Sequence, residues 1–334
     1  MALAETERLS EFLASAALSQ AICSVAELGV ADHIDAGTPQ SVEYLAEATG
    51  AHERSLYRIL RYMASYGIFR ETGNRQFDHT PLSAVLRGDA PGSFRAAGLM
   101  FYLMKGAWGS LHQSALTGKP GFDEAYGQPM FDYIGAHPEL PAIFDAGMTS
   151  FHGYETSAML DAYDFSGIET LADVGGGNGY LLSAALRRYP KMKGILFDLS
   201  HVVERTRSRL QAEGLTDRCS IVEGSFFESV PKGADAYLLR HIIHDWTDEQ
   251  SVQILRNCRK AVPAHGRILL VEFAVPGANE RSLAKAADMI MLVFTGGLER
   301  TEEEYRTLFR EAGFRLSGVT PTASAVSVVE GRPV

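Results

Sequence analysis

The sequence predicts an α/β protein in which a mixed seven-stranded sheet with helices on both faces follows a mostly helical N-terminal region. Two observations lead to this fold class. After residue 163, short apolar runs alternate with segments of helical periodicity, as in parallel strands joined by helices. Before residue 99, two short helical segments precede a hairpin pattern, which is typical of a winged helix-turn-helix.

Composition narrows the class of protein. The 334 residues suffice for two domains, and 46% hydrophobic with 22% charged residues is ordinary for a globular chain. A net charge of −10 argues against nucleic acid or an anionic membrane as the main partner. The cysteines are widely spaced, so we expect no disulfide framework and no zinc site, and a reducing cytoplasm as location. The acidic start of the chain does not resemble a signal peptide, and no run of eighteen apolar residues predicts a membrane span.

The first helical segment, residues 8–36, is too apolar for an isolated solvated helix. We expect another surface, such as a second copy of the chain, to cover it. Helices over 41–50 and 51–69 follow, and Gly73-Asn74 is expected to form the hairpin turn of the wing.

The winged-helix pattern raises DNA binding as an alternative function. Between Ser41 and Arg95 the chain has seven arginines, no lysine and six acidic residues. A DNA-binding domain usually carries a strong basic stripe, which this balance does not provide. The pattern therefore favours a structural or dimerisation role.

Residues 99–163 are again helical and rich in methionine and aromatic side chains. We expect most of them to form core. The same residue types also line pockets for flat apolar ligands, because methionine adapts to several shapes.

The segment Thr170–Asp198 predicts a βαβ unit that binds a nucleoside. An apolar run ends at Asp173-Val174, and four of the next five residues are glycine. A helical pattern and a second apolar run follow, the latter ending at Asp198. Glycines let the backbone approach a ligand, and an acid on the next strand accepts hydrogen bonds from ribose hydroxyls.

The glycine spacing discriminates between nucleoside ligands. A dinucleotide fingerprint, G-x-G-x-x-G, would need a third glycine where Tyr180 stands, and no phosphate-binding G-x-x-x-x-G-K-[ST] loop is present. Asp173 suits a positively charged ligand better than a phosphate. S-adenosylmethionine, with its sulfonium and ammonium groups, fits both features. A glycine-rich turn without any ligand is the remaining alternative, which Asp198 disfavours.

Three ionisable side chains are expected at the carboxyl edge of the sheet. His244 follows the strand at 234–241, Glu272 ends the strand at 266–273, and Glu299 precedes a helix that Thr301 could cap. A histidine whose Nδ1–H is held by a carboxylate can act as a general base. The alternatives are a surface His-Asp cluster and a solvated Glu299–Arg300 ion pair. We expect His241 to point to the opposite face and to be structural.

Taken in order, five motifs resemble the S-adenosylmethionine-dependent O-methyltransferases that include plant phenolic, hydroxyindole and bacterial polyketide or phenazine enzymes. The motifs are Asp173-Val174-Gly175-Gly176-Gly177-Asn178-Gly179, Phe197-Asp198-Leu199, Gly224-Ser225-Phe226-Phe227, His244-Asp245-Trp246 and Gly296-Gly297-Leu298-Glu299-Arg300-Thr301. The resemblance covers nearly the whole chain. It implies a winged-helix homodimerisation domain over 1–98, a helical connector lining the acceptor pocket over 99–163, and a Rossmann-like methyltransferase domain over 164–334.

The resemblance also implies roles for individual residues. His244 would be the general base, with Glu272 and Glu299 orienting it. The cofactor would be held by Asp173, Gly175, Gly177, Asp198, Leu199, Gly224, Ser225, Phe226 and Arg240. The acceptor pocket would include Met104, Trp108, Met148, His152, Asp245, Met291 and Phe294. Many relatives have Asp at Ser225, Lys at Arg240 and a basic residue at Leu298. A serine at 225 can hydrogen-bond to the adenine but contributes no charge. Leu298 and Phe294 make the acceptor side more apolar, so we expect a flat, weakly polar acceptor.

The expected reaction is methyl transfer from S-adenosylmethionine to a hydroxyl of a small aromatic natural product, without a metal. Two alternatives stay open. The same fold could methylate carbon or nitrogen, or hydroxylate or decarboxylate with the cofactor as a spectator. The chain could also be a winged-helix regulator that senses the nucleoside.

Overall fold

The computed structural model describes residues 2–334, except for the side chains of residues 2, 3, 201, 204, 205 and 208. The chain forms two compact units. The first unit comprises the chain up to Gly106 together with Phe131–Gly153, and the second comprises Ala107–Met130 and Tyr154–Val334. The connector predicted over 99–163 thus contributes to both units.

The first unit contains the expected winged helix. Its helices are α1 (Ala2–Leu28), η1 (Val30–His33), α2 (Val42–Thr49), α3 (Glu53–Ser65), α4 (Pro81–Ala84), α5 (Arg95–Met104) and α8 (Met130–Ala136), together with the start of α9 (Leu140–Ala162). Strands β1 (Gln40–Ser41), β2 (Phe69–Gly73) and β3 (Gln76–His79) form a small sheet in the order β1-β3-β2. The short helix η2 (Lys105–Ser110) joins the units in sequence.

The hairpin turn lies one residue later than predicted. Strand β2 runs through Gly73, and Asn74 and Arg75 form the two-residue tip, both in the left-handed conformation with φ of 49° and 58°. Two left-handed residues match the twist of the flanking strands, and asparagine adopts this conformation more readily than most residues. Gly73 is needed instead at the irregular register beside the tip, where its φ is 109°.

The N-terminal half of α1 exposes an apolar face. Leu9, Phe12 and Leu13 are 60%, 59% and 75% exposed, whereas Val25 and Ala26 are buried near the other end of the helix. By length and composition alone, Ala4–Leu28 is long and apolar enough to cross a membrane. The search for eighteen consecutive apolar residues did not identify this helix, because polar residues interrupt its apolar ones. A helix whose apolar face packs against protein has the same composition.

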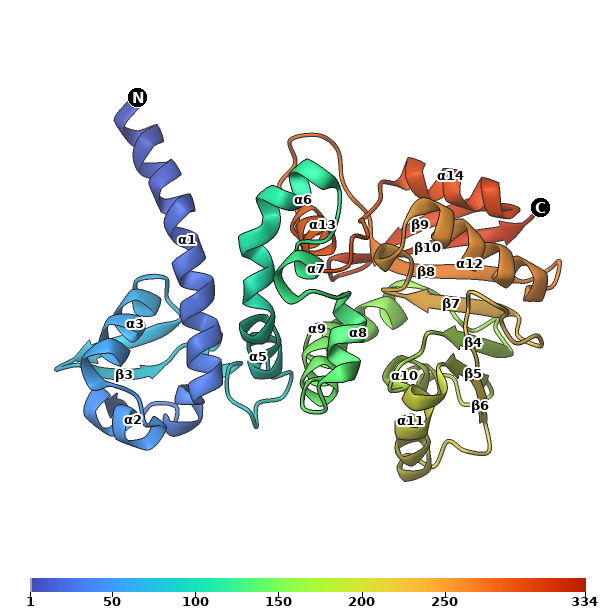
Figure 1. Ribbon diagram of the computed structural model, residues 1–334. Coiled ribbons are helices and arrows are strands. Elements are labelled where there is room, and N and C mark those ends of the chain that lie inside the picture. Colours follow the sequence, from blue (N-terminus) through green and yellow to red (C-terminus); the bar gives the residue numbers. More distant parts are fainter. Residues whose placement is uncertain (1) are drawn as a thin grey trace. The chain divides into compact units, whose positions relative to one another are not determined.

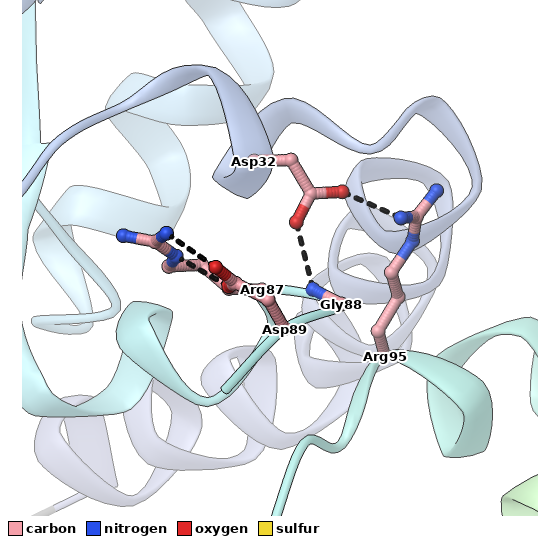
Figure 2. A pocket seen from close by; sticks show the side chains of 5 residues that line it. All are labelled: Asp32, Arg87, Gly88, Asp89 and Arg95. Carbon is pink, nitrogen blue, oxygen red and sulfur yellow. Dashed lines mark hydrogen bonds and ion pairs between the residues drawn. The ribbon is translucent and has the colours of Figure 1, made fainter. Parts of the chain in front are cut away.

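The loop between α4 and α5 is held to η1 by one carboxylate (Figure 2). Asp32 accepts a hydrogen bond of 2.7 Å from the amide of Gly88 and pairs with the Arg95 guanidinium at 2.5 Å. Arg87 pairs with Asp89 in the same surface pocket. Because the charged side chains in this pocket form ion pairs with one another, we interpret the pocket as a structural contact between η1 and the loop, and not as a ligand site.

The second unit is built on the predicted seven-stranded sheet, in the order β6-β5-β4-β7-β8-β10-β9 (Figure 1). The strands are β4 (Thr170–Val174), β5 (Lys193–Asp198), β6 (Cys219–Glu223), β7 (Ala236–Arg240), β8 (Arg267–Phe273), β9 (Phe314–Pro321) and β10 (Val326–Pro333). The pairs among the first five strands are parallel, and β10 is antiparallel to both neighbours. The mixed sheet expected from the sequence is confirmed.

Helices cover both faces of this sheet. The end of α9 packs with α10 (Tyr180–Arg188) and α11 (Ser200–Ala212) in one apolar core. The second apolar core, on the other side of the sheet, contains α12 (Asp248–Ala261) and α14 (Glu302–Ala312). The remaining helices of the unit are α6 (Leu111–Thr117), α7 (Gly121–Tyr126), η3 (Ile243–Asp245) and α13 (Leu283–Phe294). From β4 the chain winds to β5 and β6 and then returns to β7. Such a reversal leaves a crevice at the carboxyl ends of β4 and β7, where ligands bind in α/β sheets.

Candidate active site

The glycine turn after β4 is shaped by backbone conformation and close packing. Gly175 and Gly177 have φ of 72° and 55°, in the left-handed region. A Cβ atom on Gly175 would lie 2.5 Å from the Ile242 side chain, so a larger residue would displace the loop after β7. Asp198 accepts hydrogen bonds of 2.8 Å from the Gly177 amide and 2.7 Å from the Leu199 amide. The turn and the acid at the tip of β5 therefore lie together.

Asp173 lies beneath this turn as a buried acid. It is 2% exposed, and its Oδ2 has no hydrogen-bond partner within the described part of the chain. Burial raises the pKa of Asp173 to about 7, with Arg240 opposing the rise and Asp198 adding to it. An unpartnered carboxylate oxygen under a glycine turn fits a ligand that brings a positive charge, as S-adenosylmethionine does.

The residues expected at the adenine end surround the same turn. The Gly224 amide donates to the Asp198 carbonyl at 3.0 Å, and a Cβ at Gly224 would contact the Phe197 ring. Phe226 packs against Phe227 and Trp246, with ring centroids 5.0 and 6.1 Å away. The Ser225 hydroxyl accepts from the Phe227 amide at 3.3 Å, which gives this side chain a local role in the turn.

Arg240, at the end of β7, faces the carboxylates beside the turn. Its Nη1 donates to Thr156 Oγ1 on α9 at 2.7 Å. Burial lowers the pKa of Arg240, while the charges of Asp173 and Glu155 raise it. Arg240 thus supplies positive charge between the glycine turn and α9.

The three residues expected to form the base assembly are close together. His244 lies in η3 and is buried, and its Nδ1 donates to Glu299 Oε1 at 2.7 Å. Glu272 Oε2 is 3.7 Å from the same nitrogen. The other ring nitrogen, Nε2, faces Asp245 Oδ1 at 3.9 Å. The ring is thereby oriented through Nδ1, and Nε2 is left to exchange a proton.

The surrounding acids determine the charge of His244. Burial by itself would lower the pKa of His244, but Glu272, Asp245 and Glu299 together raise it to about 10. Burial in turn raises the pKa of Glu272 and of Asp245, against the pull of His244. The acids around the ring therefore favour the charged imidazolium over the neutral imidazole.

Arg300 is a structural residue of the site that sequence reasoning missed. It is 0% exposed and donates at 2.9 Å to the carbonyl oxygens of both Ile243 and Trp246, on either side of His244. It also pairs with Asp248 at 2.8 Å. The alternative of a solvated Glu299–Arg300 ion pair is wrong, because both residues are buried. No local sequence pattern distinguishes such an arginine from a surface one.

Gly297 brings the loop before α14 against the backbone of His244. The Leu298 amide donates to the His244 carbonyl at 2.8 Å, and a Cβ at Gly297 would overlap that carbonyl oxygen. This close approach places Glu299 beside the imidazole. A side chain at position 297 would clash with this backbone, which explains why the second residue of the Gly296-Gly297 pair is glycine.

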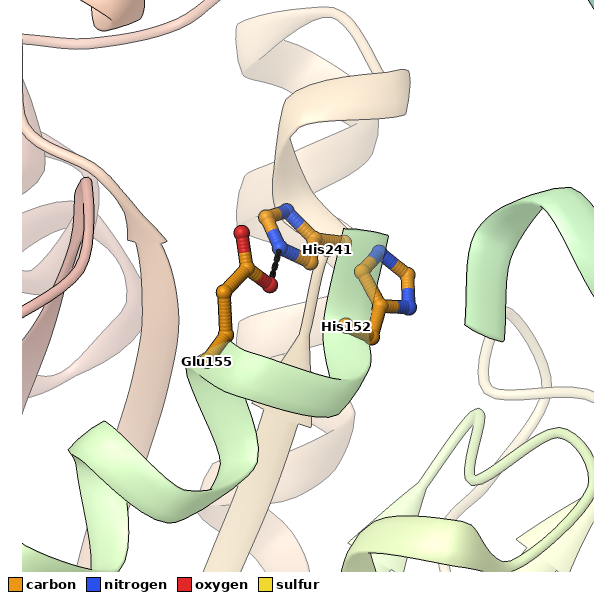
Figure 3. Close-up of side chains that lie close together, drawn as sticks. All are labelled: His152, Glu155 and His241. Carbon is orange, nitrogen blue, oxygen red and sulfur yellow. Dashed lines mark hydrogen bonds and ion pairs between the residues drawn. The ribbon is translucent and has the colours of Figure 1, made fainter. Parts of the chain in front are cut away.

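The expectation that His241 points away from His244 is wrong. The two ring centroids lie 5.0 Å apart, and His241 Nε2 is 2.9 Å from Glu155 Oε2 on α9 (Figure 3). The expectation assumed that the alternation of β7 continues past Arg240. Instead, His241 adopts a left-handed φ of 52°, which ends the alternation and redirects its side chain.

The residues expected to border the acceptor are divided between the two units. Trp108, Asp245, Met291 and Phe294 belong to the second unit, and Met104, Met148 and His152 belong to the first. Within the second unit, the Trp108 and Phe294 rings meet edge to face at 5.7 Å. Phe294 also lies 6.2 Å from Phe122, which stacks on Tyr126 at 4.3 Å. Phe122 and Tyr126 belong to the aromatic-rich segment that the sequence offered as a pocket lining, but neither was among the residues expected to border the acceptor.

Comparison with known proteins agrees with the geometry. The chain matches an O-methyltransferase domain over residues 108–315 and an O-methyltransferase dimerisation domain over residues 10–89. It is 42% identical to phenazine O-methyltransferase PhzM of Lysobacter antibioticus, over 95% of this chain and 93% of that protein. It is 38% identical to the mitomycin biosynthesis 6-O-methyltransferase of Streptomyces lavendulae, over 98% of this chain and 95% of that protein.

Solved structures show the same similarity. The S-adenosylhomocysteine-bound form of CalO1, a methyltransferase in calicheamicin biosynthesis, superposes with a TM-score of 0.89. The two chains are 36% identical, and the comparison covers 99% of each.

Replacing Arg300 with lysine should destabilise the protein. A single ammonium cannot reach both carbonyls that flank His244, and each buried polar group left unpaired costs about 1–3 kcal/mol. We expect a lower midpoint of urea unfolding. Arg306→Lys, which alters exposed ion pairs on α14, should change it little. Equal midpoints for the two variants would contradict the role of Arg300.

Asp173→Asn should separate stability from ligand affinity. The pKa of Asp173 rises from 3.8 to about 7 on folding. Ionising this carboxyl therefore costs more in the folded protein, so the free energy of unfolding falls as the pH increases from about 4 to 7 and stays low above 7. We expect the ligand-free variant to gain more stability at pH 8 than at pH 5 in urea unfolding. Calorimetry should show weaker binding of S-adenosylmethionine. Asp161→Asn, at an exposed ion pair, is the control, and unchanged cofactor affinity in Asp173→Asn would refute the assignment.

Proposed function

Because the chain belongs to the family of S-adenosylmethionine-dependent O-methyltransferases, we propose that it methylates a hydroxyl group of a small aromatic natural product, with His244 as general base. One observation carries the proposal. The Nδ1 of a buried histidine is held by Glu299 at 2.7 Å at the sheet edge that also carries the glycine turn. The phenazine and mitomycin relatives and the aromatic cluster around Phe294 support a flat aromatic acceptor.

S-adenosylmethionine is the cofactor of this enzyme, and when bound it supplies an electrophilic methyl group. We assign its methionine portion to Asp173, Gly175 and Gly177, and its ribose to Asp198 and Leu199. Gly224, Ser225 and Phe226 would hold the adenine, and Arg240 would close the site. The unpartnered oxygen of Asp173 and the position of Asp198 beside the turn support this assignment.

His244 would accept the proton of the acceptor hydroxyl. A phenol with a pKa of about 10 is a weak nucleophile at neutral pH, and a positioned base typically contributes about 10²–10⁴ in rate. The positive charge of the bound cofactor would disfavour the imidazolium nearby and would so lower the pKa of His244. The freed Nε2 can then take the proton, after which Glu272 and Glu299 stabilise the charged ring. Asp245, 3.9 Å from Nε2, borders the acceptor side.

The first unit would join two copies of the chain. It contains the O-methyltransferase dimerisation domain, and the exposed face of Leu9, Phe12 and Leu13 on α1 is a suitable contact. Covering this face with protein also accounts for its apolar composition without a membrane. We propose a cytoplasmic homodimer that binds neither nucleic acid nor membrane.

His244→Asn tests the base directly. We expect the turnover number at pH 8 to fall about 10²–10⁴-fold, because proton removal is lost, with cofactor affinity largely unchanged. Turnover would be followed with a hydroxyphenazine acceptor and methyl-deuterated S-adenosylmethionine. Mass spectrometry distinguishes gain of one methyl from hydroxylation or decarboxylation without methyl gain, and NMR of the product distinguishes a methyl on oxygen from one on carbon or nitrogen. Turnover equal to that of the parent enzyme would exclude His244 as the base.

Phe12→Glu combined with Leu13→Glu tests the dimer. Two charges on the exposed face should shift the molar mass in solution from dimer toward monomer, measured by light scattering after gel filtration. Leu283→Glu, at a 71% exposed position on α13, is the matched control and should leave the mass unchanged. A monomeric parent protein, or a double variant that stays dimeric, would disprove this contact.

A further inference from the structure

We propose that Thr206 on α11 is a positioning residue for the cofactor: its hydroxyl holds the carbonyl of Gly177 and so fixes the shape of the glycine turn that receives S-adenosylmethionine. This inference rests on the proposed assignment of that turn to the methionine portion of the cofactor. Thr206 acts only through the backbone of the turn.

The hydroxyl of Thr206 is committed to the turn. Its Oγ1 donates to the Gly177 carbonyl at 2.7 Å, whereas the Val202 carbonyl of its own helix lies 3.4 Å away. A threonine inside a helix often donates to the carbonyl four residues earlier, but a hydroxyl has a single hydrogen to donate. The shorter contact therefore takes this hydrogen, and the side chain joins α11 to the turn.

Thr206 occupies an apolar position of α11. It lies three residues after Val203 and four before Leu210, on the helix face that packs with α10 in one core (Figure 1). Thr206 is 0% exposed, like Val203. A valine would fill the same space without a polar group to bury, so packing alone does not account for the hydroxyl.

Hydrogen bonds hold Gly177 from two sides. Its amide donates to Asp198 Oδ2 at 2.8 Å, and its carbonyl accepts from Thr206. An added Cβ at Gly177 would meet no atom of the described chain within 4 Å, so no neighbouring side chain supports this residue sterically. Because the C=O and N–H of a trans peptide point in opposite directions, the bond to Thr206 also sets the direction of the Asn178 amide.

The bond from Thr206 is independent of the ligand. Asp198 is the acid assigned to the ribose, so its oxygens are shared between backbone amides and the bound cofactor. Thr206 is buried in α11 and has no part in the proposed cofactor contacts. It therefore holds the turn in one conformation before the ligand arrives. A turn that is already ordered loses less conformational entropy on binding, which strengthens affinity.

Thr206→Val removes the hydroxyl and keeps the methyl group that lies close to the backbone of Gly179. We expect the Kd of S-adenosylmethionine and of S-adenosylhomocysteine, measured by calorimetry, to rise about three- to tenfold, which corresponds to the loss of one hydrogen bond. The KM for S-adenosylmethionine should rise by the same factor. The kcat at saturating cofactor should stay near the parent value, because the base and the acceptor contacts are unchanged.

Two further variants distinguish positioning from a structural role. Thr206→Ser retains the donor and should recover most of the affinity. Ser183→Ala removes another buried hydroxyl, on α10, whose Oγ has no hydrogen bond within the described residues, and it should leave the Kd unchanged. If the valine variant does not fold, Thr206→Ala provides the same comparison.

Three results would overturn the proposal. The first is a lower midpoint of urea unfolding in Thr206→Val with an unchanged Kd, which a purely structural role predicts. The second is an equal rise in Kd in Ser183→Ala, and the third is a serine variant that binds no better than the valine variant.

Hydrogen exchange measures the order of the turn without any ligand. Peptides that cover residues 174–182 should exchange faster in ligand-free Thr206→Val than in the parent protein and in Ser183→Ala. Equal exchange in all three proteins would refute the role of the hydroxyl in ordering the turn.

These measurements separate the role of Thr206 from the proposals on which it rests. Binding of S-adenosylhomocysteine needs neither an acceptor nor His244, so the result does not depend on the base. If Asp173→Asn weakens binding and Thr206→Val does not, the role of Thr206 fails and the cofactor assignment stands. If both variants bind like the parent, the assignment of the turn to the cofactor fails as well.

Discussion

The site depends on one buried carboxylate. Glu272 ends β8 without solvent contact and accepts two amides from the chain that leaves β7. These bonds fix the start of η3 and therefore the position of His244. An anion in this environment is stable only with partners, since burial strongly favours its neutral form. The other oxygen of Glu272 lies 3.7 Å from the Nδ1 atoms of His241 and His244, so the group that orients the loop also faces both rings.

The loops around this carboxylate are held by close backbone approach. Gly175 admits the Ile242 side chain, and Gly297 lies against the His244 carbonyl. Arg300 then joins the carbonyls on either side of His244 from below the loop. Three separate segments meet at the sheet edge with little room for adjustment. Such packing fixes the position of His244 through the scaffold, as the proposed proton transfer would require.

The site also accumulates negative charge. Asp173, Glu272 and Glu299 are buried and Asp245 is partly buried. The positive groups near them are Arg240 at the end of β7, Arg300 and the histidines. Burial is the main cause of the raised pKa of Asp173, and the neighbouring acids are the cause of the raised pKa of His244. A positively charged cofactor would offset the negative charge at both places. If His244 is the base, as proposed, cofactor binding would favour its neutral form through charge.

The sequence determined the features that depend on local pattern. Apolar periodicity predicted the seven-stranded sheet and the winged helix, because strands and helices repeat over a few residues. Strand ends followed by polar residues indicated that His244, Glu272 and Glu299 share one edge, and the spacing of the glycines argued against a dinucleotide pyrophosphate site. The catalytic and cofactor roles of these residues are proposals that the geometry supports.

Only the tertiary structure decided how groups distant in sequence share charge and space. The left-handed backbone of His241 broke the alternation on which its predicted orientation rested. Arg300 is buried and donates to two carbonyls beside His244. No pattern in the residues next to Arg300 predicts these contacts. The partnership of Glu155 with His241 joins α9 to the end of β7 across 86 positions. Periodicity describes a segment and its faces, whereas these contacts exist only after the segments pack.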